Sequence, residues 1–132
     1  QARTEFERVL AMQPDDAPTR LNLARIEAAA GNQEAVRTLV RPVVVATPDN
    51  EAALLMLAEA EARLGNTTEA IRLLDQGLSL VPNSLQIRAA LGGMHLALGD
   101  PARVLDLLRG LTPAQFDGLP RLLELRGRAE LA

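Results

Sequence analysis

Apolar and polar positions along this chain follow a helical period. Apolar residues recur at steps of three and four, as in Ile71, Leu74 and Leu78 and again in Leu54 and Leu57. This spacing places them on one face of an α-helix. The pattern predicts an all-α chain of about eight helices. They are expected at residues 2–13, 17–30, 33–46, 51–64, 67–80, 85–98, 101–110 and 119–131.

The turns between these stretches recur at a fixed interval. Three prolines are spaced 34 residues apart, and three glycines share that spacing. Glycine tolerates the left-handed backbone that closes a helix, whereas proline has no N–H to continue one. The interval therefore marks a unit of two antiparallel helices. The prolines are Pro14, Pro48 and Pro82, and the glycines are Gly31, Gly65 and Gly99.

This unit resembles the tetratricopeptide repeat (TPR), which has a 34-residue period. The resemblance implies a right-handed superhelical α-solenoid of antiparallel helix pairs. Residues 51–84 match the family at Leu54, Leu57, Ala58, Gly65, Ala70, Leu74 and Pro82. Residues 1–132 then form a single TPR domain. It would comprise the second helix of a preceding repeat (1–16), three repeats (17–50, 51–84 and 85–118) and the first helix of a following repeat (119–132).

The chain departs from the family where aromatic residues are usual, so packing between helices is expected to differ there. The positions hold Arg20, Leu54 and Arg88 and, seven residues on, Glu27, Glu61 and His95.

Pro42 interrupts the helix expected at 33–46. A proline inside a helix costs about 3 kcal/mol and kinks the axis. Within this helix the Ala35–Val36 pair lies one residue before the position that the 34-residue period predicts. Pro48 lies at its predicted position. We therefore expect a bent helix with a one-residue bulge beside Pro42.

A stack of repeats has a concave side, which is its usual binding surface. In TPR proteins the first helix of each pair lines that side, so the resemblance implies a groove. Its lining would be Leu21, Asn22, Arg25, Ala28 and Ala29; Ala52, Leu55, Met56, Glu59, Ala62 and Arg63; Gln86, Ala89, Ala90, Gly93, Leu96 and Ala97; and Arg121, Glu124 and Arg128.

This lining is shallow and mostly apolar, with a few arginines. It lacks the Lys and Asn pattern with which chaperone-binding TPRs hold a C-terminal carboxylate. An amphipathic helix or an apolar peptide is therefore the expected ligand. In the alternative interpretation, Leu21, Leu55 and Met56 pack between repeats and bind nothing.

Composition narrows the function further. The chain has no Cys, so disulfides and thiolate metal sites are excluded, and its net charge of −3 argues against a nucleic-acid surface. The longest apolar run, Ala52–Ala58, is too short for membrane insertion by this segment. Ser79 and Ser84 show no adjacent base, and the single His95 is interpreted as a packing residue. We expect no catalytic, cofactor or metal site, and no enzyme activity.

Three functions stay open. The first is a protein–protein interaction and scaffold module. The second is a structural spacer in a longer envelope or exopolysaccharide-export protein, since residues 105–113, 122–125 and 127–131 resemble the large bacterial TPR lipoproteins associated with exosortase systems. The third is an accessory domain of an enzyme that lies outside this chain. The compartment stays open between the bacterial periplasm or cell envelope and the cytoplasm.

The chain begins and ends within a helix pair. Phe6, Leu10, Leu122 and Leu125 would each have a face without a neighbouring repeat. We therefore expect either a piece of a longer array or end-to-end association between chains.

Overall fold

The structure is a computed structural model that describes residues 16–131. The helix expected at 2–13, with Phe6, Leu10 and Pro14, lies outside the described residues. The chain divides into two compact units, with the boundary in the sequence between Leu73 and Leu74. We call them unit 1, described from residue 16 to Leu73, and unit 2, from Leu74 onward. The predicted repeat bounds stay a prediction.

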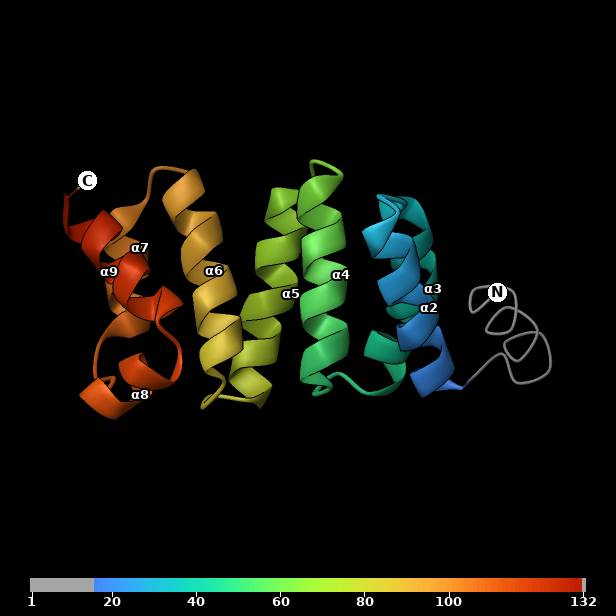
Figure 1. Ribbon diagram of the computed structural model, residues 1–132, viewed down its shortest axis with the longest axis horizontal. Coiled ribbons are helices and arrows are strands. Elements are labelled where there is room, and N and C mark those ends of the chain that lie inside the picture. The colour runs from blue at the N-terminus through green and yellow to red at the C-terminus, as the bar shows by residue number, and fades with distance from the viewer. Residues whose placement is uncertain (1–15, 132) are drawn as a thin grey trace. The chain divides into compact units, whose positions relative to one another are not determined.

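Residues 16–131 contain eight helices and no strand (Figure 1). Every helix predicted between residues 17 and 110 is present, with ends that agree to within two residues. The all-α class is therefore confirmed. The helices are α2 (Ala17–Ala29), α3 (Gln33–Ala46), α4 (Glu51–Arg63), α5 (Thr67–Leu80), α6 (Leu85–Ala97), α7 (Pro101–Leu108), α8 (Pro113–Gly118) and α9 (Arg121–Leu131).

The periodic glycines end the first helix of each pair, as the sequence predicts. Gly31, Gly65 and Gly99 have φ angles of 83°, 89° and 77°, a conformation that side chains with a Cβ rarely adopt. The residue that follows each glycine donates its backbone N–H to the carbonyl of the residue five positions before it, at 2.8–2.9 Å. These bonds satisfy carbonyls at the helix end, so each turn is fixed by local chemistry.

The bulge expected beside Pro42 is wrong, because α3 is one α-helix from Gln33 to Ala46; the bend expected there stays a prediction. Its buried residues Val36, Leu39, Val40 and Val43 lie 34 residues before Ala70, Leu73, Leu74 and Gly77, which are buried in α5. Val36 thus takes the position of Ala70, and no extra residue is needed. Pro42 and Thr38 are both exposed, so water can solvate the Thr38 carbonyl that lacks a donor.

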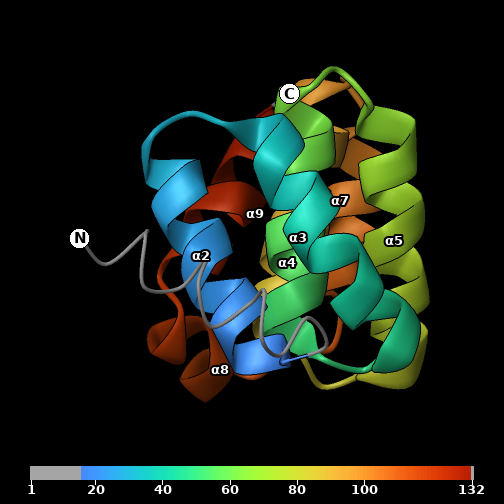
Figure 2. The same ribbon diagram turned by 90° about the vertical axis from the view of Figure 1, so that its right-hand side faces the viewer.

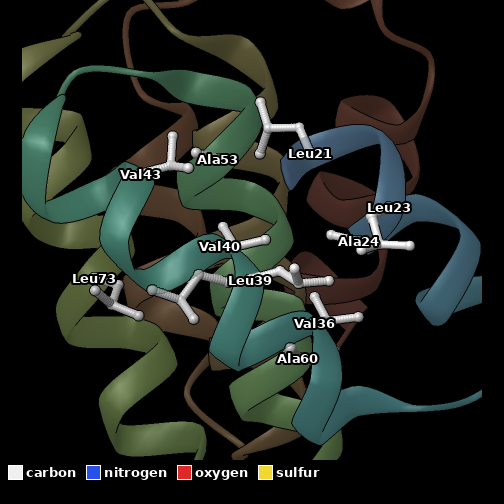
Figure 3. Packing of buried hydrophobic residues seen from close by; sticks show 11 residues of the cluster. Leu21, Leu23, Ala24, Val36, Leu39, Val40, Val43, Ala53, Ala60 and Leu73 are labelled. Atoms are coloured by element: carbon white, nitrogen blue, oxygen red, sulfur yellow. The ribbon is translucent and has the colours of Figure 1, made fainter. Parts of the chain in front are cut away.

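Unit 1 has its core between α2, α3 and α4, and α3 contacts both of the others (Figure 2). Val36 and Val43 of α3 lie beside Ala60 and Ala53 of α4, respectively (Figure 3). These alanines are fully buried, and their small side chains allow close helix packing. The cluster comprises Leu21, Leu23, Ala24, Val36, Leu39, Val40, Val43, Ala53, Leu57, Ala60 and Leu73.

A buried carboxylate fills one of the family's aromatic positions in unit 1. Glu61 is 3% exposed, and it accepts a hydrogen bond from Nε of Arg37 at 2.5 Å. Nη2 of Arg41 lies 3.6 Å from its other oxygen. Because Arg37 donates this hydrogen bond to the Glu61 carboxylate, the pKa of Arg37 is raised. An ion pair between α4 and α3 thus replaces aromatic packing, as buried charges require partners.

Arginine fills the other aromatic position in two helix pairs. Nη1 of Arg20 donates to the Leu39 carbonyl at 3.4 Å, and Nη1 of Arg88 donates to the Leu107 carbonyl at 2.8 Å. Each arginine therefore joins the first helix of its pair to the second. The expectation of different packing at these positions is confirmed.

Unit 2 packs α7 against α6 and α9, with α8 against α9. Leu122 and Leu125 lie inside this core with Phe116 of α8, so the free faces expected for them are wrong. The guanidinium of Arg126 lies 4.5 Å from the centre of the Phe116 ring. End-to-end association loses this support and stays a prediction.

The sequence prediction missed α8. The Thr112 side chain accepts from the Gln115 N–H, and the Gln115 side chain accepts from the Thr112 N–H, which is a capping box. Pro113 is the first residue of the helix, where proline is favoured. The last helix begins at Arg121 instead of residue 119, because a residue that precedes proline, as Leu119 does, disfavours helical backbone.

Candidate partner-binding surface

A pocket of about 130 Å³ lies in unit 1, where the α2–α3 turn meets α4. Four of its residues were predicted for the groove from the sequence: Ala28, Met56, Glu59 and Arg63. Two others come from the first turn of α3. The complete lining is Ala28, Gln33, Val36, Met56, Glu59 and Arg63.

The floor of the pocket is apolar and anchored in the core. Val36 is fully buried, and Met56 is partly buried and packs against the unit 1 cluster. Methionine is flexible and polarizable, so this floor can adapt to side chains of different shape. Ala28 is exposed and leaves the side toward α2 open.

The rim carries an ion pair along α4. Nη2 and Nε of Arg63 lie 2.9 and 3.2 Å from Oε1 of Glu59. Both side chains are more than 60% exposed, so solvent screens the pair and it contributes only about 0.3–0.5 kcal/mol. A partner can therefore rearrange this rim at little cost in free energy.

The size of the pocket limits its ligands. Sites for small molecules usually enclose about 300–1,000 Å³, well above the volume of this pocket. Its volume and open side suit one apolar side chain that projects from a larger partner.

Arg25 lies on α2, one helical turn before Ala28 and on the same face. Its Nη1 donates to Oδ1 of Asn22 at 2.8 Å. Among residues 16–131 it pairs with no carboxylate. Together with the pocket, Asn22 and Arg25 form what we call the α2–α4 face of unit 1.

Two predicted lining residues lie in cores instead. Leu21 is 9% exposed and Ala89 is 1% exposed, and they belong to the clusters of units 1 and 2. They point inward because α3 covers α2 and α7 covers α6. Of the others, Ala29, Ala52, Gln86, Ala97, Arg121, Glu124 and Arg128 are exposed, while Leu55, Ala62, Ala90, Gly93 and Leu96 are partly buried.

A second pocket, of about 240 Å³, lies within unit 2 and contains no predicted groove residue. Arg88 is held in it by bonds to the carbonyls of Leu107 and Pro82, at 2.8 and 3.0 Å. The half-buried His95 also lines it. The charges are of both signs, so they favour no single ligand charge. The lining is Asp75, Arg88, His95, Arg103, Asp106 and Leu107.

Metal binding and membrane crossing find no support in residues 16–131. No group of three or more His, Asp or Glu residues is placed there to hold a metal ion. None of the helices in this range combines the length and apolar character needed to cross a bilayer.

Gln33 and Val36 are not among the residues predicted from the sequence, because the resemblance implies a lining from the first helix of each pair alone. The signal was available, since both residues directly follow the Gly31 turn. A turn this tight brings the start of α3 beside the end of α2, where Ala28 lies.

Comparison with known proteins agrees with this fold. Two family models, each described as tetratricopeptide repeat, match residues 1–60 and 51–94. The two matches together span residues 1–94. No curated protein matches the chain.

Solved structures match a larger part of the chain than the family models do. A MamA protein has 19% sequence identity and a TM-score of 0.81, over 98% of this chain and 70% of that one. The MamA RS-1 ArsTM double mutant has 17% identity and a TM-score of 0.73 over 95% of this chain, which spans only 64% of that protein. TTC0263, a thermophilic TPR protein in Thermus thermophilus, has 21% identity and a TM-score of 0.68, over 98% of this chain and 70% of that one.

At these identities the solved structures show the fold alone, which is the predicted TPR solenoid. The resemblance to exosortase-associated lipoproteins stays a prediction.

Proposed function

This chain belongs to the tetratricopeptide-repeat family, and from that premise we propose that it is a non-catalytic module that binds a helix or peptide of a partner protein. Repeat proteins of this family are generally interaction scaffolds and not enzymes. The family alone does not locate a binding site, because fold does not imply function. The proposal places the site on the α2–α4 face of unit 1.

The unit 1 pocket is the observation that carries this proposal. It joins an apolar floor to a polar rim, the combination with which grooves bind one apolar side chain of an amphipathic helix. Burial of one such side chain contributes about 1.5–3 kcal/mol. Micromolar affinity requires about 8 kcal/mol, so other contacts are needed. The exposed Ala29 and Ala52 are small enough to let a partner backbone approach.

A selection from a displayed library of randomised helical peptides, with the full chain as target, tests the proposal. Selected peptides are measured by fluorescence anisotropy against the wild type, Met56→Glu and Ala28→Glu. Both substitutions put a carboxylate into the pocket, and we expect at least about tenfold weaker binding because the anchor then meets a charge. Ala28 is exposed, so its variant should fold even where Met56→Glu loses packing.

Thr68→Glu is the matched control, because Thr68 is exposed on α5 and is not part of the pocket. It adds the same charge and should bind selected peptides as the wild type does. Equal binding by all variants, or the absence of any selected peptide, would refute the proposed site. Those outcomes would favour a structural spacer, or an accessory domain of an enzyme outside this chain.

A further inference from the structure

The α2–α4 face of unit 1 carries an excess of positive charge, although the whole chain has a net charge of −3. Glu59 and Arg63 are paired and their charges cancel. Arg25 bonds only to the neutral Asn22 amide among the described residues. Glu34, close in sequence to the pocket residue Gln33, is paired with Arg37 at 3.3 Å. The face therefore presents one cation without a carboxylate partner among residues 16–131.

The position of this cation relative to the pocket is set by the helix. Arg25 and Ala28 are three residues apart on α2, which is about 4.5 Å along the axis and on one face. A partner helix that lies alongside α2 has the same rise per residue. A side chain three or four positions from its apolar anchor would therefore reach Arg25 while the anchor fills the pocket.

We infer that the partner is an amphipathic helix with an aspartate or glutamate one helical turn from the apolar residue that enters the unit 1 pocket. Arg25 donates to that carboxylate, since a guanidinium matches a carboxylate in geometry and charge. The Asn22 amide, which now accepts from Arg25, keeps the guanidinium on this face. The inference rests on the proposed function and adds the chemistry of the partner.

The expected effect is moderate because Arg25 is exposed. Charged groups at the rim of an interface act mainly on association rate and salt dependence. We expect Arg25→Glu to weaken binding of an acidic peptide by about three- to tenfold at low salt. The effect should shrink as salt is raised, because screening shortens the reach of exposed charges.

The peptides selected for the proposed function provide the test. Those that depend on Met56 should be enriched in aspartate or glutamate three or four positions from the apolar anchor. Exchange of that acid for lysine should weaken binding to the wild type and restore binding to Arg25→Glu. Arg109→Glu is the control, since it makes the same charge change at an exposed residue of unit 2.

The outcomes separate the two ideas. Peptides that depend on Met56 but show no acidic preference, or prefer lysine, overturn the inference and leave the proposed function intact. Equal weakening by Arg25→Glu and Arg109→Glu also overturns it, because net charge alone would then account for the effect. A selection without any Met56-dependent peptide overturns the proposed function itself.

Discussion

Two glycines inside helices of unit 2 differ in their surroundings, and this difference predicts opposite outcomes for the same substitution. A methyl group on Gly92 of α6 would lie 3.3 Å from Cδ1 of Leu125 and 3.8 Å from Cγ1 of Val104. A methyl group on Gly127 of α9 would have nothing within 4 Å. The effect of Gly127→Ala on the free energy of unfolding therefore depends on helix propensity alone. The effect of Gly92→Ala depends on helix propensity and on packing.

The magnitudes follow from these distances. Alanine is about 0.8–1.0 kcal/mol more favourable than glycine inside a helix, so Gly127→Ala should raise the free energy of unfolding by about 1 kcal/mol. At Gly92 the contact with Leu125 is shorter than the optimum of about 3.5–4.0 Å between carbons. Overpacking costs about 1–3 kcal/mol, and the low end applies because Cδ1 is the end of a side chain. The terms nearly cancel, and Gly92→Ala should change stability by less than about 0.5 kcal/mol.

Urea unfolding followed by far-ultraviolet circular dichroism measures both variants, since the chain has no Trp or Tyr for fluorescence. Leu125→Ala costs about 2–5 kcal/mol by itself, but it removes the atom in contact with Gly92. In the Leu125→Ala background, Gly92→Ala should therefore raise the free energy of unfolding by about 1 kcal/mol. The coupling energy between the two substitutions is then about 1 kcal/mol. An equal rise in urea midpoint for the two single glycine variants would refute the close contact between α6 and α9.

Two further predictions concern unit 1. Pro42→Ala should raise the free energy of unfolding by up to about 3 kcal/mol, because it restores a donor for the Thr38 carbonyl; a lower urea midpoint would argue against a continuous α3. Hydrogen bonds from Arg72 lower the pKa of Glu69, so this pair stabilises the fold above roughly pH 4 and loses its contribution as the pH falls through the lowered pKa. The urea midpoints of the wild type and Glu69→Gln should therefore converge between about pH 6 and pH 3, and a constant difference would refute a charge contribution.

The fold could be predicted because its signals are local. Each turn between the two helices of a pair has a glycine with positive φ, and the second helices α3, α5 and α7 have clear apolar faces. The short helix α8 also has a local signal, the Thr112–Gln115 capping box, which a search for the period overlooks. The misplaced bulge at Pro42 has a different cause: Val36 occupies a position where the period suggests alanine, so a register based on alanine is wrong by one residue.

The candidate site was predictable only in part. The family register identifies Met56, Glu59 and Arg63, because these residues lie on the free side of α4. It does not reveal that Leu21 and Ala89 are buried, since burial depends on the helix that covers each of them. Nor does it predict the ion pair of Glu61 with Arg37, because the two residues lie on different helices and 24 residues apart in sequence.

The buried carboxylate of Glu61 also bears on how the chain avoids misassembly. Two periods later the same position holds Ala129, which lies in the apolar cluster of unit 2 with Val104 and Leu108. If the helix pair that contains Glu61 packed at the position of the Ala129 helix, its carboxylate would be buried against apolar side chains without an arginine partner. Such burial costs several kcal/mol. Identical repeats have no such penalty and can exchange places during folding. The buried charge of Glu61 thus disfavours docking of its helix at the position of Ala129.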